Sequence, residues 1–173
     1  MDLKKLIRNV PNFPKEGIIF KDITTLLKSS DGLSSAAEEL YNLSKNNKIT
    51  KVVGIESRGF ILGGILADKL KAGFVPIRKP GKLPAERLSE TYSLEYGTDT
   101  IEIHKDAIQK GDRILLHDDL LATGGTMEAA CSLVEKLGGE VVQISFIIEL
   151  DFLNGRQKLS KYDIHSLIHF DSE

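Results

Sequence analysis

The chain has 173 residues, a length that fits one domain able to bury roughly 70% of the surface that its unfolded form exposes. Its 23 Lys and Arg residues nearly balance its 25 Asp and Glu residues, and the net charge of −2 argues against a global affinity for nucleic acid or anionic membranes. Any site for a polyanion must therefore be local.

The composition also predicts a cytoplasmic protein. The single cysteine, Cys131, cannot form an intramolecular disulfide and falls in an apolar helical stretch, where a small core residue is expected. The first residues are basic but lack the apolar stretch of a signal peptide, and no segment approaches ~18 uninterrupted apolar residues. Without repeats or composition breaks, residues 1–173 are expected to form a single domain.

Hydrophobic periodicity predicts alternating helices and strands. Apolar residues with helical spacing predict a helix over residues 33–43, and the run KVVGI predicts a strand that ends at Ile55. Helical spacing returns over residues 60–70, and FVPI predicts the next strand. A polar insertion follows between Pro80 and Thr91, and YSLEY and TIEIH then predict a hairpin.

The second half of the chain continues this alternation. LLH predicts a strand, residues 127–137 a helix that ends at Gly138, and EVVQISFII a strand that begins at Glu140. Continuous apolar strands alternating with helices are typical of an α/β fold with a parallel sheet covered on both faces. Ligands bind beyond the carboxyl ends of such strands, where Glu56, Arg58 and Asp118 all fall.

Residues 114–126 (ILLHDDLLATGGT) carry the most specific pattern. An apolar strand delivers Asp118 and Asp119 into a turn of small residues that opens a helix. Backbone N–H groups of such a turn can converge on a phosphate, while ionised carboxylates suit sugar hydroxyls or a hydrated divalent cation. The pattern favours a phosphosugar site over a capped turn with two solvated acids. The candidate phosphate ligands are Ala122, Thr123, Gly124, Gly125 and Thr126.

The turn after the strand that ends at Ile55 is a candidate for a second anionic group. Ser57 and Arg58 lie in this turn, where a guanidinium and nearby amides can address a phosphate. The alternative is an ion pair between Arg58 and Glu56 that only caps the turn.

Three cations, Arg78, Lys79 and Lys82, flank the polar loop after FVPI. A mobile segment there could fold over a pyrophosphate and exclude water, and a solvated surface loop is the alternative.

These motifs resemble those of the type I phosphoribosyltransferases, and DDLLATGGT resembles the form found in the adenine phosphoribosyltransferase family. Other stretches of the chain resemble the same family: FPKEGIIFKDIT, GIESRGF, GKLP, YSLEYG and GRQKL. The resemblance implies a Rossmann-like core, in which helices cover both faces of a twisted parallel sheet, and a flexible lid built from the loop and hairpin. It also implies a strained or cis peptide before Ser57 and a homodimer in which one basic residue reaches the neighbouring subunit.

The activity implied by the resemblance belongs to purine salvage. It is transfer of the 5-phosphoribosyl group from phosphoribosyl pyrophosphate to adenine, giving AMP and pyrophosphate, with Mg²⁺ carried on the donor and no metal held directly by the protein. Asp118 and Asp119 are then expected to hold the ribose hydroxyls, and residues 122–126 the 5′-phosphate. Ser57, Arg58 and the lid lysines are expected to hold the pyrophosphate.

The resemblance also implies a base site and an acid–base catalyst. The ring of Phe20 is expected to pack on the purine, with the main chain of Ile19 and Lys21 reading the base edge. Glu95 is expected to exchange a proton with the base, and Arg58 is the second expected catalytic residue. Tyr96, next to Glu95, is expected to bind substrate. From the residues alone, Phe20 would rather pack onto the core and Glu95 would be solvated.

Two positions depart from the family pattern. The family commonly carries arginine where Lys21 stands, which main-chain recognition of the base would tolerate. Relatives usually have a branched aliphatic residue where His117 stands, so His117 is expected to hydrogen-bond a neighbour. The histidines show no ligand spacing, so no transition-metal site is expected.

Other functions stay open from the sequence. The acceptor could be hypoxanthine, guanine or xanthine, or the chain could be a non-catalytic regulator that senses phosphoribosyl pyrophosphate. The regulator is less favoured because there is no helix-turn-helix region or basic run for DNA. A generic nucleotide-binding domain is the weakest alternative, because the chain has neither G-x-G-x-x-G nor G-x-x-x-x-G-K-[ST].

Overall fold

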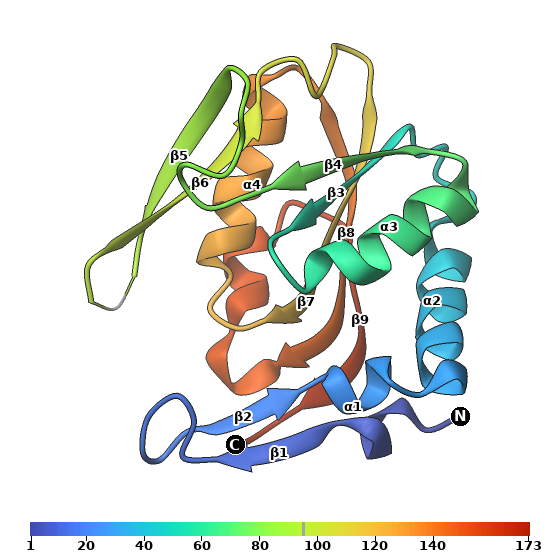
Figure 1. Ribbon diagram of the computed structural model, residues 1–173, viewed down its shortest axis with the longest axis vertical. Coiled ribbons are helices and arrows are strands. Elements are labelled where there is room, and N and C mark those ends of the chain that lie inside the picture. Colours follow the sequence, from blue (N-terminus) through green and yellow to red (C-terminus); the bar gives the residue numbers. More distant parts are fainter. Residues whose placement is uncertain (95) are drawn as a thin grey trace.

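The computed structural model describes residues 1–94 and 96–173 and is built around a parallel sheet (Figure 1). The sheet has five strands in the order β4-β3-β7-β8-β9. The predicted α/β fold with a parallel sheet is therefore confirmed. The strands are β3 (Lys51–Ile55), β4 (Gly73–Ile77), β7 (Arg113–Leu121), β8 (Glu140–Leu150) and β9 (Ile164–Phe170).

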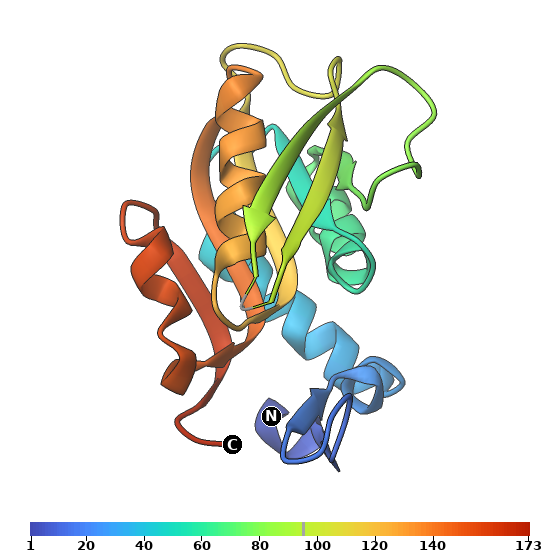
Figure 2. The same ribbon diagram turned by 90° about the vertical axis from the view of Figure 1, so that its left-hand side faces the viewer.

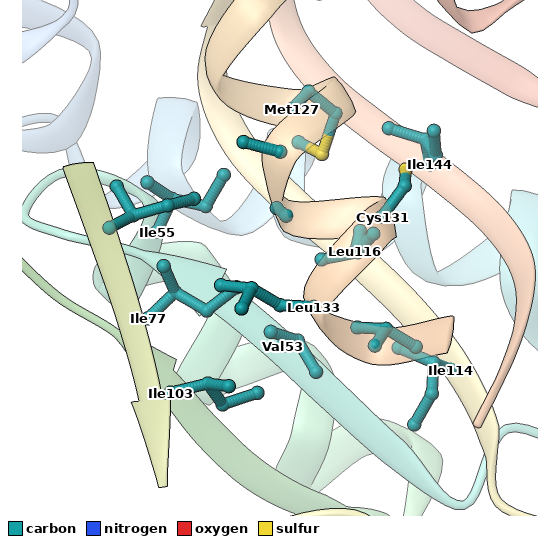
Figure 3. Packing of buried hydrophobic residues seen from close by; sticks show 14 of the residues in the cluster. Val53, Ile55, Ile77, Ile103, Ile114, Leu116, Met127, Cys131, Leu133 and Ile144 are labelled. Atoms are coloured by element: carbon teal, nitrogen blue, oxygen red, sulfur yellow. The ribbon is translucent and has the colours of Figure 1, made fainter. Parts of the chain in front are cut away.

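Helices cover both faces of the sheet because its inner strands carry apolar residues on both sides (Figure 2). Val52 and Leu115 pack with α2 (Ser30–Ser44) and α3 (Gly59–Leu70) on one face. Val53 and Leu116 pack with α4 (Gly125–Lys136) on the other face (Figure 3). Adjacent residues of one strand thus serve two separate cores.

The predicted helices and strands agree with these elements to within a few residues. The hydroxyl of Ser29 accepts a hydrogen bond from Gly32 N at 3.1 Å and so caps α2, which begins before the periodic apolar residues. The apolar helix α3 ends at Leu70 and is followed by Lys71, which has a left-handed conformation. Gly138, with φ of +92°, follows α4 where the sequence predicted the helix end.

The predicted hairpin consists of β5 (Arg87–Ser93) and β6 (Thr98–His104), which pair antiparallel beside α4 (Figure 1). Ile101 and Ile103 of β6 are buried against the α4 face of the sheet. β5 begins earlier than YSLEY, so part of the segment predicted as a loop is a strand. Exposed and half-buried residues alternate along β5, but most of them are polar, so the sequence shows no alternation of apolar and polar residues there.

A second, short hairpin near the N-terminus was not predicted as strands. It consists of β1 (Arg8–Pro11) and β2 (Ile19–Asp22), and it is flanked by η1 (Leu3–Leu6) and α1 (Thr24–Leu27). It lies beside the end of β9, where the ammonium of Lys21 is 4.5 Å from the ring centroid of Phe170. Two short helices, η2 (Asp151–Leu153) and η3 (Gly155–Leu159), connect β8 to β9. None of the described helices combines the length and apolar character that a membrane crossing requires.

Candidate active site

The carboxyl ends of β3, β4 and β7 meet around a cavity of about 560 Å³. The end of each strand, or the turn after it, contributes polar side chains, so residues far apart in the sequence face one space. Glu56 and Arg78 line this cavity. It is also lined by one residue predicted for the 5′-phosphate, Thr126, and by all the residues predicted for the sugar and the pyrophosphate: Ser57, Arg58, Lys79, Lys82, Asp118 and Asp119.

The paired acids are held differently from each other. Asp119 is buried and accepts a hydrogen bond from Nε of Arg58, which forms an ion pair across the cavity floor. Asp118 accepts from the backbone N–H of Asp119 at 2.8 Å. Burial and the neighbouring charge of Asp119 raise the pKa of Asp118 well above its usual range. With its pKa raised, Asp118 can take up a proton and then donate a hydrogen bond.

Close packing of α3 on β7 brings these acids to the cavity. A Cβ at Gly59 would lie 2.9 Å from the carbonyl oxygen of His117 and 3.0 Å from Oδ1 of Asp118. Any larger residue would push the first turn of α3 away from the tip of β7. Gly59, the residue after Arg58, therefore allows the turn that carries Arg58 to approach the acids of β7 closely.

The turn of residues 122–126 encloses a smaller hollow of about 80 Å³, which Asp118 also lines. Gly124 has φ of +87°, in the left-handed region that favours glycine, and α4 begins at the next residue. Thr126 lines both this hollow and the larger cavity. The five predicted phosphate ligands thus share one concave turn at a helix N-terminus, a geometry that suits an anion.

Gly155 of η3 packs against the back of this turn, a support that the sequence analysis did not assign. A Cβ at Gly155 would overlap the carbonyl oxygen of Ala122, and a Cβ at Gly124 would lie 2.6 Å from the carbonyl oxygen of Gly155. Only the likeness of GRQKL to family members marked this segment. Its packing partner is set by tertiary structure and has no local signal.

Glu56 pairs with Arg78, so the ion pair between Glu56 and Arg58 considered from the sequence does not form. Nη2 of Arg78 lies 2.7 Å from Oε1 of Glu56, and the backbone N–H of Lys79 donates to Oε2 at 2.8 Å. Both bonds lower the pKa of Glu56, and the bond from the Lys79 backbone contributes more than the bond from Arg78. The peptide between Glu56 and Ser57 is cis, as the family resemblance implied. Because Glu56 pairs with Arg78, Arg58 is available to pair with Asp119.

The β5–β6 hairpin contacts the site through residues that the sequence analysis did not single out. Tyr92 OH donates to Oδ2 of Asp99 at 3.2 Å, and Oγ1 of Thr126 donates to Tyr92 OH at 3.0 Å. Nζ of Lys79 is ion-paired with the same oxygen of Asp99. Burial opposes the charge of Lys79, but the bond to Asp99, the charge of Asp99 and the neighbouring Tyr92 together outweigh it and raise the pKa of the ammonium.

Glu95, the predicted acid–base catalyst, lies outside the described residues. Its neighbour Tyr96 is 81% exposed and is not among the described residues that line the cavity. The loop before the hairpin is fixed by buried Glu102, which accepts from Gly81 N at 2.8 Å and from Nε of Arg87 at 2.9 Å.

The residues predicted for the base lie on β2, next to the cavity. The guanidinium carbon of Arg58 is 5.6 Å from the ring centroid of Phe20, and Phe13 packs edge-on against that ring at 5.2 Å. Ile19 and Lys21 flank Phe20 on the strand, and buried Nζ of Lys21 donates to Oδ1 of Asn9 at 3.1 Å. These residues are not among the described residues that line the cavity, but Arg58 connects the two regions.

Comparison with known proteins identifies the family. A family model described as the phosphoribosyl transferase domain matches residues 21–170. An adenine phosphoribosyltransferase of Halothermothrix orenii is 60% identical over 168 residues, which cover 97% of this chain and 99% of that protein. The chain belongs to the adenine phosphoribosyltransferase family.

Solved structures of this family have the same fold. An adenine phosphoribosyltransferase from Thermoanaerobacter pseudethanolicus superposes with a TM-score of 0.95 at 54% identity, and 98% of each chain is covered. One from Saccharomyces cerevisiae, complexed with adenine and an imino-altritol bisphosphate, has a TM-score of 0.92 at 41% identity, with 96% of each chain covered. Family membership makes the protein an enzyme of the phosphoribosyltransferase class and confirms the resemblance seen in the motifs.

His117, which directly precedes the paired acids, is fully buried. Its Nδ1 lies 2.9 Å from Oγ of Ser145 on β8, which confirms the predicted hydrogen bond to a neighbour. Its Nε2 has no hydrogen-bond partner among the described residues. Burial lowers the pKa of His117 to about 4, so the ring is neutral near pH 7.

Among the described residues, the cavity offers few free oxygen ligands for a metal. Asp119 is engaged by Arg58, and Glu56 by Arg78 and the Lys79 backbone, which leaves Asp118 as the carboxylate with the most unused capacity. Mg²⁺ commonly binds one or two carboxylates together with substrate phosphates and water. The residues therefore fit a cation that arrives with a phosphorylated ligand better than a metal held by the protein alone.

A separate group of potential metal ligands lies at the ends of β8 and β9. Glu149, Asp151 and His169 place ligand atoms within 4.8 Å of one another. However, Arg156 and Ser166 already bond both oxygens of Glu149, and Nδ1 of His169 lies 2.9 Å from Oδ1 of Asp151. Sequence spacing missed this group because it forms only where two parallel strands end side by side.

Proposed function

We propose that this enzyme transfers the 5-phosphoribosyl group of phosphoribosyl pyrophosphate to N9 of adenine, with AMP and pyrophosphate as products. The observation that carries the proposal is the partition of charge in one cavity. Asp118 lines both the hollow of residues 122–126 and the larger cavity, where Asp119 is paired with Arg58 and where Lys79 also lies. A donor with a phosphate at one end, a diol in the middle and a pyrophosphate at the other matches this order.

Each part of the site has a proposed role in binding the donor. Backbone N–H groups of residues 122–126 and the Thr126 hydroxyl would hold the 5′-phosphate, and Asp118 and Asp119 would hold the ribose hydroxyls. Arg58, Ser57, Lys79 and Lys82 would hold the pyrophosphate. When bound with the donor, Mg²⁺ would offset the negative charge of the phosphates.

The proposed chemistry needs little covalent participation by the protein. The bond between C1′ and the pyrophosphate oxygen breaks as N9 of the base bonds to C1′, through an oxocarbenium-like state. Arg58 and the lid lysines would stabilise the leaving pyrophosphate, and the loop of residues 78–86 would limit the entry of water. Glu95 is proposed from the YSLEYG motif to accept the proton that the base loses.

The base is proposed to bind at the N-terminal hairpin. The ring of Phe20 would pack on the purine, and the main chain of Ile19 and Lys21 would read its edge. Support comes from the position of Phe20 beside Arg58, at 5.6 Å, and from the Saccharomyces cerevisiae family member, whose structure contains adenine.

Four further properties are part of the proposal. Residues 1–173 would form a single phosphoribosyltransferase domain that assembles as a homodimer, as the family resemblance implies. Mg²⁺ would arrive on the donor, which fits the shortage of free carboxylates described above. A reducing, cytoplasmic location fits the single cysteine, Cys131, which is buried and free.

A base panel tests the proposal. Purified enzyme is incubated with phosphoribosyl pyrophosphate, Mg²⁺ and adenine, hypoxanthine, guanine or xanthine, and both the nucleotide and pyrophosphate are quantified. Adenine should give AMP and pyrophosphate in equal amounts at a rate at least about 100-fold above the other bases. Preference for another base would overturn the acceptor, and donor binding without transfer to any base would favour the sensing regulator.

A further inference from the structure

Tyr92 and Asp99 face each other across the β5–β6 hairpin and connect two parts of the site. They are directly opposite partners in the antiparallel register. Tyr92 OH donates to Oδ2 of Asp99 at 3.2 Å and accepts from Oγ1 of Thr126 at 3.0 Å. The same oxygen of Asp99 is ion-paired with Nζ of Lys79. A continuous polar chain therefore runs from Thr126 to Lys79.

The two ends of this chain line the cavity, whereas its middle lies behind them. Thr126 and Lys79 are among the residues that surround the 560 Å³ space, and Tyr92 and Asp99 are not among the described residues that do so. Tyr92 also packs against the buried residues on the α4 face of the sheet, so its ring is fixed by the core. The pair is thus placed to hold other side chains rather than to touch a ligand.

We propose that Tyr92 is a positioning residue that, together with Asp99, holds the Thr126 hydroxyl and the Lys79 ammonium at the spacing of the two phosphate ends of the donor. The inference rests on the proposed function, because it assigns Thr126 to the 5′-phosphate and Lys79 to the pyrophosphate. It extends that function to a hairpin pair that does not touch the donor.

The chemistry of the groups allows Thr126 and Lys79 to keep their partners when the donor binds. The ammonium of Lys79 has three N–H donors, so it can retain Asp99 and still donate to a pyrophosphate oxygen. A hydroxyl has one donor and two lone pairs. When Thr126 turns its proton to a phosphate, its oxygen can accept the single proton of Tyr92, which then leaves Asp99. Asp99 keeps its bonds from Lys79 and from the backbone N–H of Thr100, and the cross-strand pairing of Tyr92 with Asp99 still joins the two ends.

Titration of the donor onto variant enzymes tests this role. Wild type and Tyr92→Phe are titrated calorimetrically with phosphoribosyl pyrophosphate and Mg²⁺ in the absence of base. Phenylalanine keeps the packing and removes only the hydroxyl, so the Kd for the donor should rise about threefold to tenfold, the effect of one lost hydrogen bond. In steady-state assays the KM for the donor should rise by the same factor, while the KM for adenine stays within about twofold.

A double-mutant comparison separates positioning from a general structural effect. If Tyr92 acts through the Thr126 hydroxyl, Tyr92→Phe should raise Kd by less than about twofold in a Thr126→Val background. Thr100→Val is the matched control, because it removes the neighbouring cross-strand contact of the same hairpin, between the hydroxyls of Thr91 and Thr100 at 2.9 Å. Its Kd should equal that of wild type.

The outcomes distinguish this inference from the proposed function. An unchanged or tighter Kd in Tyr92→Phe, or an equal loss in Thr100→Val, would overturn the positioning role even if the wild type makes AMP. Weaker donor binding by Tyr92→Phe in a protein that transfers to no base would support the positioning role while the proposed function fails. A wild type that does not bind the donor would overturn both.

Discussion

Arg58 donates from Nε to Oδ2 of Asp119, and this ion pair joins the turn after β3 to the tip of β7. Asp119 is buried, with a side chain only 8% exposed, whereas Arg58 is 45% exposed and has its guanidinium carbon 5.6 Å from the ring centroid of Phe20. One guanidinium therefore contacts the proposed sugar site and the proposed base site and also faces the cavity. Its planar shape makes these contacts possible together.

Replacing Arg58 by lysine should keep the charge but lose this geometry. We expect kcat/KM for the donor to fall about 10- to 100-fold, because an ammonium cannot bond Asp119 and present a flat face to Phe20 at once. Steady-state kinetics measure the change. Arg113→Lys is the control, since Arg113 pairs with Glu140 at 3.0 Å at the start of β7, far along the strand from the site, and should leave kcat/KM unaltered. Equal losses in both variants would contradict the role of Arg58.

Glu95→Gln tests the proposed proton transfer. The change removes an ionisable group of the same size, so kcat should fall by roughly 10² to 10⁴ while the Kd of the donor changes little. Rapid-quench kinetics and donor titration provide the two readouts. Glu90→Gln is a control on the same hairpin, where Glu90 pairs with Lys136 at 2.5 Å on the surface. Unchanged turnover in Glu95→Gln would remove Glu95 from the mechanism.

His117 should make the protein sensitive to mild acid. Because burial lowers its pKa to about 4 from 6.5, the unfolded chain binds a proton in this range that the folded protein does not. Stability contributed by neutral His117 is complete above pH 6.5 and is lost as the pH falls toward 4, by up to about 3 kcal/mol. His117→Val lacks this loss.

Urea unfolding of both proteins measures the difference. The free energy of unfolding of His117→Val relative to wild type should increase by up to about 3 kcal/mol between pH 7.5 and pH 4, and should be constant between pH 7 and pH 8. Asp118 titrates in both proteins, so the comparison isolates the histidine. A difference that is the same at pH 7.5 and pH 4.5 would show that His117 is not held neutral.

Gly155→Ala should displace the turn of residues 122–126, which is proposed to bind the phosphate, because Gly155 packs against it. The added Cβ would overlap the carbonyl oxygen of Ala122, so the turn must shift. We expect the Kd for AMP to rise at least about tenfold, with a loss of stability of about 1–3 kcal/mol from overpacking. Gly64→Ala is the matched control, because a Cβ at Gly64 in α3 meets nothing within 4 Å, and it should bind AMP normally. Tight AMP binding by Gly155→Ala would contradict the support role.

The core of the fold could be predicted because its signals are local. The apolar run of β3 and the acids that follow the apolar part of β7 place the site at the sheet edge before any tertiary contact is known. The short strands β1 and β2 were missed because four polar or mixed residues carry no clear period. The early start of β5 was missed for the same reason.

Partner choice within the site could not be predicted. Whether Glu56 pairs with Arg58 or Arg78 depends on how β3 and β4 lie together, and the sequence left that alternative open. The contacts of Tyr92 with Asp99 and Thr126 join a hairpin to a helix start 34 residues further along the chain. Residue types indicated the chemistry, whereas pairings of this kind arise only from tertiary structure.

A crystal structure of the enzyme with AMP, pyrophosphate and Mg²⁺ tests the central claim most directly. We predict the 5′-phosphate in the turn of residues 122–126, the ribose hydroxyls on Asp118 and Asp119, and the pyrophosphate beside Arg58 and Lys79. A nucleotide seated elsewhere, with both acids turned to bulk solvent, would contradict the assignment of the site.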